Sequence, residues 1–192
     1  IPDEAIWNAH LQCKQQLIDQ VRHLCGVTLD PDLPILGFAR RMTEYKRPDL
    51  IFSDLERLKA IASQQPFQLV MAGKAHPHDQ DGKQLIATLH QHLHALNIRA
   101  AYLPNYNMDI ALTMVAGVDL WLNTPLKPLE ASGTSGMKAA LNGVPHFSVL
   151  DGWWLEGCIE GVTGWAIGAR DAVNGGDATS FYEKLEQIVL PL

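Results

Sequence analysis

The amino-acid sequence predicts an α/β fold, in which a parallel sheet carries helices on both of its faces. Short, continuous apolar runs alternate with longer amphipathic stretches along most of the chain. Continuous apolar strands are typical of parallel sheets, because such strands are covered on both faces. The composition agrees, since 192 residues with 47% hydrophobic and 19% charged side chains suffice for one domain with a sizeable core. We therefore expect residues 1–192 to form a single domain.

The expected elements follow from this alternation in chain order. A long amphipathic helix, which Asp3 and Glu4 can cap, is expected at about residues 3–25, because its apolar residues recur at helical spacing. The strands are expected at residues 35–39, 67–72, 98–103, 118–122 and 146–150. The later helices are expected at about residues 48–63, 81–96, 108–115, 136–141 and 178–189, the first of them with Pro48 in its first turn. A looser segment with four glycines, at positions 157, 161, 164 and 168, precedes the last helix.

Charge, cysteine count and histidine spacing exclude several classes of protein. The net charge is −6 with no basic stripe, so nucleic acid and anionic membranes are poor candidates for partners. The three cysteines, Cys13, Cys25 and Cys158, are odd in number and lack CxxC spacing, which favours a reduced, cytoplasmic chain. Histidines alternate at residues 90–94 of an expected helix, where such spacing does not bring them to one face, so no metal site is expected. The chain opens without Met, and we expect it to be a piece of a longer protein.

The most informative segment is EASGTSGMK, residues 130–138, which leads into an expected helix. Glycines allow an anion to approach the backbone closely, and the start of a helix adds a favourable dipole. A Walker P-loop does not fit the spacing from Gly133 to Lys138, and the segment is not GxGxxG. The segment therefore predicts a ligand that bears a phosphate, with the Lys138 amine beside it.

Further polar segments follow other expected strands. Four cations lie within residues 40–47, directly after the first strand, and residues 73–74, 104–106 and 123–138 also follow strands. Because parallel sheets bind ligands beyond the carboxyl ends of their strands, we expect these segments to converge at one edge.

Together these segments resemble the glycogen/α-glucan phosphorylases. Residues 130–143 are similar to the family's pyridoxal-phosphate lysine segment, and residues 40–47 to its phosphate-binding segment. Residues 72–77 and 105–106 also match, and residues 151–157 are similar to the shorter prokaryotic branch. The resemblance includes the first expected helix and covers most of the chain in order.

This resemblance implies a fold and an activity. The chain would be the C-terminal, Rossmann-like domain of a GT-B type glycosyltransferase, with the active site in the cleft between two domains. The implied enzyme is an α-glucan phosphorylase, which uses pyridoxal 5′-phosphate for the reversible, retaining phosphorolysis of glycogen, starch or maltodextrin to glucose 1-phosphate. Its partners would be α-1,4-glucan, glucose 1-phosphate, inorganic phosphate and the N-terminal domain of the same chain. No nucleic acid or membrane is expected as a partner. A homo-oligomer is possible under this resemblance. With one wall of the cleft, the isolated chain is expected to be inactive.

The resemblance also assigns the cofactor site. Lys138 would be the attachment point of the cofactor, and Gly133, Thr134 and Ser135 would hold its phosphate. Arg40 would lie beside that phosphate, and Tyr106 would pack against the cofactor ring.

The substrate site is assigned in the same way. Arg41 and Lys46 would hold the substrate phosphate, because two phosphates held close together need fixed cations between them. Glu130 would contact glucosyl hydroxyls, with backbone groups of Ala131, Ser132 and Gly133 beside it.

Each assignment has a structural alternative. Lys138 could be a surface lysine at a helix start, and Arg41 and Lys46 could belong to a solvated basic turn. Glu130 could cap the helix, and Tyr106 could be a half-buried aromatic at a strand end.

Two other functions compete with the phosphorylase. A nucleotide-sugar glycosyltransferase of the glycogen or starch synthase type resembles this chain around a Glu-x7-Glu pattern. Here the residue eight positions after Glu130 is Lys138, which suits an aldehyde rather than ribose hydroxyls. A non-catalytic glucan-binding module would not need Arg41, Lys46 and Lys138 together.

Overall fold

The computed structural model describes residues 1–170 and 175–191. Among these residues, six strands form one all-parallel sheet in the order β3-β2-β1-β4-β5-β6. The strands are β1 (Ile35–Ala39), β2 (Gln68–Ala72), β3 (Ala100–Leu103), β4 (Leu120–Asn123), β5 (His146–Val149) and β6 (Gly164–Ile167). The helices are α1 (Asp3–Cys25), α2 (Leu55–Gln64), α3 (Gln80–Ala95), α4 (Met108–Gly117), α5 (Thr134–Leu141), α6 (Trp154–Gly157) and α7 (Asp177–Lys184). This architecture confirms the predicted Rossmann-like α/β fold.

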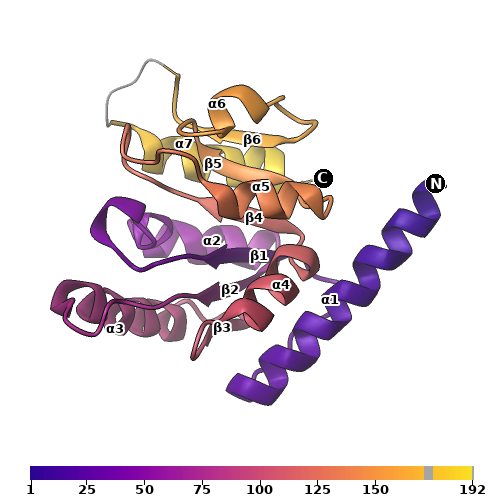
Figure 1. The fold of residues 1–192 in the computed structure, drawn as a ribbon, viewed down its shortest axis with the longest axis horizontal. Coiled ribbons are helices and arrows are strands. Elements are labelled where there is room, and N and C mark those ends of the chain that lie inside the picture. The colour runs from indigo at the N-terminus through magenta and orange to yellow at the C-terminus, as the bar shows by residue number, and fades with distance from the viewer. Residues whose placement is uncertain (171–174, 192) are drawn as a thin grey trace.

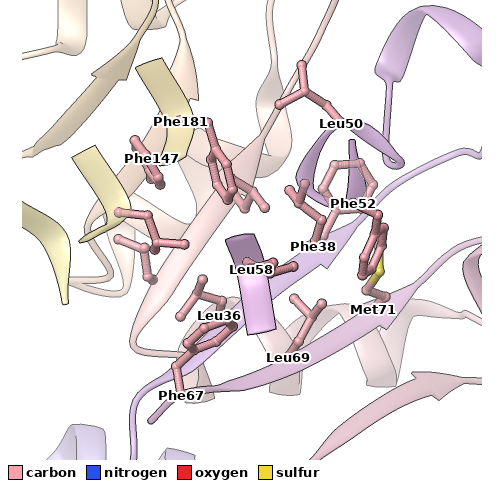
Figure 2. Close-up of a cluster of buried hydrophobic side chains, with 14 of the residues drawn as sticks. Leu36, Phe38, Leu50, Phe52, Leu58, Phe67, Leu69, Met71, Phe147 and Phe181 are labelled. Atoms are coloured by element: carbon pink, nitrogen blue, oxygen red, sulfur yellow. The ribbon is translucent and has the colours of Figure 1, made fainter. Parts of the chain in front are cut away.

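The sheet separates two hydrophobic cores, one on each face. One core packs α2, α3 and α7 against one face, and the other packs α1, α4 and α5 against the opposite face. Successive side chains of a strand point to opposite faces of the sheet, so each strand contributes to both cores. In β1, Leu36 and Phe38 belong to the first core, while Ile35 and Ala39 belong to the second. Figure 2 shows part of the first core, in which Leu36 and Phe38 lie around Leu58 of α2.

Three elements differ from the sequence-based expectation. The helix expected at residues 48–63 is a short 3-10 turn, η2 (Leu50–Phe52), followed by α2, because the Asp54 side chain accepts a hydrogen bond from the Arg57 N–H and starts a new helix. The glycine-bearing segment contains the short helix α6 and the unexpected edge strand β6. The last helix changes from α7 to a π-helical turn, η3 (Leu185–Val189).

Helix α1 lies outermost on its face and packs mainly on α4 (Figure 1). A buried polar cluster at the amino ends of β1 and β4 holds it in place. Lys14 Nζ lies 2.9 Å from Asp119 Oδ2 and donates to the Leu33 carbonyl, while His10 Nε2 lies 2.9 Å from Asp119 Oδ1. None of the helices in the described part of the chain is long and apolar enough to span a membrane.

The strand order reverses between β1 and β4, which lie side by side although two β-α units separate them in sequence. Ligands of open parallel sheets bind at this switch point, beyond the carboxyl ends of the strands. Here β1 ends at Ala39, directly before Arg40, and β4 ends at Asn123, at the start of the segment that carries Glu130.

Candidate functional site

A pocket of about 470 Å³ lies at this switch point. It is lined by Ala39, Arg40, Arg41, Tyr45, Lys46, Tyr106, Ala111, Val115, Glu130, Ala131, Ser132, Gly133, Thr134, Ser135 and Lys138. Every residue that the sequence predicted for the cofactor and substrate sites therefore lines one pocket. A larger hollow of about 710 Å³ lies at the outer edge of β3 and contains none of these residues.

Sequence reasoning missed part of the pocket wall. Tyr45, which had no separate signal, lies beside Lys46, whose Nζ is 4.5 Å from the centre of the Tyr45 ring. Ala111 and Val115 of α4 supply an apolar wall, which helical periodicity alone does not distinguish from core.

Glu130 joins two of the predicted cations. Lys46 Nζ lies 2.5 Å from Glu130 Oε2, and Arg40 Nη2 donates to the same oxygen. Burial alone would raise the pKa of Glu130, but the hydrogen bond from Lys46 and the charge of Arg40 hold it below its usual value. Glu130 is thus ionised and ties the segment after β4 to the segment after β1.

The pocket nevertheless has more cationic groups than partners for them. Arg40 Nε and Nη1 are buried and have no hydrogen-bond partner within the described part of the chain. Across the same residues, the exposed side chains of Arg41 and Lys138 make no hydrogen bond or ion pair. The described lining residues thus carry four positive charges and one negative charge, a formal net charge of +3. An anionic ligand, or two, would balance it.

The Gly-rich loop is shaped to present backbone groups to such an anion. Gly133 has φ of 81°, a left-handed conformation that favours glycine, and α5 starts directly after it at Thr134. The helix thus begins two residues earlier than expected, so Thr134 and Ser135 belong to its first turn, where backbone N–H groups have no intrahelical acceptor. The Ser135 hydroxyl is also buried without a hydrogen-bond partner among the described residues.

Residues 151–153 brace this loop from behind. Asp151 Oδ2 accepts a hydrogen bond of 2.9 Å from the Glu130 N–H, and the Trp153 N–H donates to the Ser132 carbonyl over 2.9 Å. Glycine at position 152 allows the two segments to pack this closely, since a Cβ there would lie 2.6 Å from the Ser132 carbonyl oxygen. The Asp-Gly-Trp sequence therefore positions the loop.

Tyr106 follows β3 and is half-buried at the pocket wall, where it also packs against the core that contains α4. Burial raises the pKa of Tyr106, and the positive charge of Arg40 opposes this effect. Both of its predicted roles, ring contact and strand-end aromatic, are compatible with this position.

A Rossmann-like sheet with a cationic, lysine-bearing pocket at its switch point defines the class of protein, an α/β domain whose pocket suits an anionic ligand. The chain belongs to the carbohydrate phosphorylase family, whose sequence model, described as "Carbohydrate phosphorylase", matches residues 3–161. The family resemblance predicted from the sequence is thus confirmed.

Named relatives agree with this membership. The chain is 45% identical to a glycogen phosphorylase of Aquifex aeolicus and 43% identical to a maltodextrin phosphorylase of Thermococcus litoralis, and both comparisons cover 100% of the chain. It is 28% identical to the H isozyme of potato (Solanum tuberosum) α-glucan phosphorylase over 78% of the chain. The matched parts amount to 31%, 26% and 20% of these relatives, so the chain spans a third of their length or less.

Proposed function

We propose that this chain is the C-terminal, cofactor-binding domain of an α-glucan phosphorylase. The complete enzyme would catalyse the reversible phosphorolysis of α-1,4-glucan to glucose 1-phosphate, with retention at the anomeric carbon. The single observation that carries the proposal is the pocket itself, in which Lys138 stands eight residues after Glu130 and the net charge is +3.

The residues of the pocket fit pyridoxal 5′-phosphate. The cofactor phosphate would lie at Thr134 and Ser135, within reach of the two unpartnered nitrogens of Arg40, and Lys138 offers a free amine for attachment. When bound, the cofactor supplies a phosphate whose second pKa of about 6 suits proton exchange with the substrate phosphate. Tyr106 would limit the cofactor ring on one side.

The remaining cations would hold the substrate phosphate. Arg41 has a free guanidinium that can form two parallel hydrogen bonds with a phosphate, and Lys46 supplies a compact charge beside it. These fixed charges would offset the repulsion between two neighbouring phosphates. Because Arg40 and Lys46 share Oε2 of Glu130, Oε1 is left to accept a glucosyl hydroxyl, with the backbone of Ala131, Ser132 and Gly133 beside it.

The competing functions fit this pocket less well. A nucleotide-sugar transferase would need a carboxylate at position 138, where this chain has a free amine. A non-catalytic glucan-binding module would not explain an excess of buried and exposed cations around one loop.

We further propose that the complete enzyme works in the cytoplasm and that the rest of its chain closes the pocket. Apolar pairs one helical turn apart are exposed on α4 (Met108 and Leu112) and α5 (Met137 and Leu141), beside the pocket. Such a surface suits an interdomain contact. The 192-residue piece alone is therefore expected to produce no glucose 1-phosphate from glucan and phosphate, and its production would contradict this part of the proposal.

The experiment uses the full-length enzyme. We expect a pyridoxal absorbance band and phosphorolysis of maltodextrin, with both lost in Lys138→Ala. Lys59→Ala is the matched control, since Lys59 lies on α2 and its one ion pair among the described residues is with Glu56 on the same helix. A wild-type enzyme that lacks the band and turns over a nucleotide sugar would overturn the proposal.

A further inference from the structure

Two glycines of the loop rest on a cluster of aromatic rings behind the pocket. Trp153 lies beneath both, since a Cβ at Gly133 would be 3.3 Å from its Cδ1, and a Cβ at Gly136 would be 3.0 Å from its Nε1. His146, the first residue of β5, lies beneath Gly136 and packs edge-on against Trp154, with ring centres 4.7 Å apart. The front of the loop thus faces the pocket and its back faces these rings.

Glycine is needed at position 136 because the neighbouring rings leave no space for a side chain, and not because the backbone there is left-handed. It lies inside α5 without a positive φ, where glycine destabilises a helix by about 1 kcal/mol relative to alanine. A Cβ at this position, however, would lie 2.4 Å from Cε1 and 2.7 Å from Nε2 of His146. The Gly136 backbone therefore lies against the His146 ring, with no room for a side chain between them.

The His146 ring is uncharged at physiological pH. Burial, together with the positive charge of Arg40, lowers the pKa of His146 to about 3. Its Nε2 lies 3.4 Å from Asn123 Nδ2 at the end of β4, an arrangement in which the amide donates and the ring nitrogen accepts. His146 thus supports the loop without adding a charge behind the anion pocket.

The cluster is more polar than a simple spacer needs to be. Asn123 Oδ1 and Trp153 Nε1 are buried without hydrogen-bond partners within the described residues, as is Ser135 Oγ on the loop itself. An unpaired buried polar group costs about 1–3 kcal/mol, so an apolar side chain would be the better filler if packing were the only purpose. The polar atoms lie behind the turn that carries Ser135 and leads to Lys138.

We propose that His146 is a positioning residue of the phosphate site: its ring supports the backbone at Gly136 and thereby sets the positions of Ser135 and Lys138 relative to Arg40. This inference rests on the proposed function, because the position of this turn matters through the cofactor held there. His146 acts through the backbone of α5 and does not touch the reacting atoms.

The test is a double-mutant cycle in the full-length enzyme, read by the dissociation rate of pyridoxal phosphate and by the wavelength of its absorbance band. Gly136→Ala pushes the turn off the ring, so we expect dissociation at least about tenfold faster, in line with the sensitivity of sites to displacements of about 1 Å. Gly136→Ala combined with His146→Ala removes the contacts at 2.4 and 2.7 Å and leaves only the milder 3.0 Å approach to Trp153 Nε1. The double variant should therefore return the rate to within about threefold of wild type. Gly175→Ala is the matched control, since a Cβ there would meet no atom of the described residues within 4 Å, and it should change neither readout.

Rescue by a conservative variant separates positioning from bulk packing. We expect His146→Gln to keep the wild-type band wavelength and His146→Leu to shift it, with similar thermal unfolding of the two cofactor-free proteins. The proposal would be overturned if Gly136→Ala released pyridoxal phosphate at the wild-type rate, or if the double variant did not recover that rate. A wild-type enzyme without a pyridoxal band would instead contradict the proposed function. In that case the same cycle is read by the dissociation constant of inorganic phosphate. Recovery of the wild-type constant in the double variant would support the positioning role of His146, and its absence would overturn it.

Discussion

The two ends of the sheet carry two buried ion clusters of the same type, and they differ in how completely their atoms are paired. At the amino end, Asp119 contacts His10 and Lys14, and its Oδ2 also accepts a 2.7 Å hydrogen bond from the Ile35 N–H. Lys14 adds a hydrogen bond to the Leu33 carbonyl. Both carboxylate oxygens and the ammonium group therefore have protein partners.

At the carboxyl end, Glu130 also contacts two basic groups, yet the cluster is incomplete. Oε2 of Glu130 accepts hydrogen bonds from both Arg40 and Lys46. Two nitrogens of Arg40 have no hydrogen-bond partner among the described residues. A buried charge that is fully paired within the protein holds elements together, whereas a buried charge left unpaired prepares the site for a ligand. From this contrast we infer a structural role for the cluster at the amino end, and it supports the proposed ligand-binding role of the cluster at the carboxyl end.

The largest expected effect is on the amino end, where Asp119→Asn leaves Lys14 buried without its counter-ion. Removing one partner of a buried pair costs on the order of 3 kcal/mol, so the free energy of local opening of α1 should fall by about that amount. Hydrogen–deuterium exchange of the α1 amides in the full-length enzyme measures this change. Inorganic phosphate should not reverse it, because this cluster has no open position for an anion.

Glu130→Gln is the matched variant at the other end. It leaves Arg40 and Lys46 without their shared carboxylate, but in a pocket where an anion can replace it. Exchange protection of the α5 amides should fall and then recover when phosphate is added. Recovery at both ends, or at neither, would remove the distinction between the two clusters.

The next effect is on phosphate recognition by Arg41. Its exposed side chain has no protein partner in the described structure, so Arg41→Ala should leave thermal stability unchanged. The loss of charged hydrogen bonds to the substrate should raise KM for phosphate about 30-fold, with little change in KM for glucan. Initial rates in the phosphorolysis direction test this, with Arg22→Ala on α1 as an arginine control. Equal losses for phosphate and glucan would contradict the assigned role.

The sequence predicted the fold where its signals were continuous. Strand β1 is an uninterrupted apolar run and β2 is apolar after Gln68. Both strands are buried along their whole length, and they were located to within a residue. Strand β6 was missed because it begins with Gly164, lies among further glycines and gives no usable periodicity. The break before α2 had a local signal in Asp54, a good N-cap residue, but 3-10 and α-helical turns have similar apolar spacing.

The site was predicted as a set of residues but not as a set of contacts. Arg40, Arg41 and Lys138 could be brought together because parallel strands end at the same edge of the sheet. That Glu130 would hold Arg40 could not be predicted, since the two residues are 90 positions apart and their contact depends on loop conformation. The support of Gly136 by His146 is likewise a property of packing, because nothing in the sequence around either residue indicates the other.

The smallest effect is on pH dependence, and it should also distinguish the two ends. The pKa of His146 is lowered from its usual 6.5 to about 3 in the folded protein, so the unfolded state binds the extra proton between these values. Stability that depends on neutral His146 is thus complete above about pH 7.5 and falls on acidification, with a slope that approaches about 1.4 kcal/mol per pH unit below about pH 5.5. Asp119 has a lowered pKa, because hydrogen bonds from His10 and Lys14 outweigh the opposing effect of burial, so its contribution is lost only below about pH 4. Between pH 6.5 and 5.5, exchange protection of the β5 amides, corrected for intrinsic rates, should therefore fall by about 1 kcal/mol, and His146→Gln should abolish this slope. A slope that persists in His146→Gln would assign the acid sensitivity of the carboxyl end to another group and would leave His146 a packing residue only.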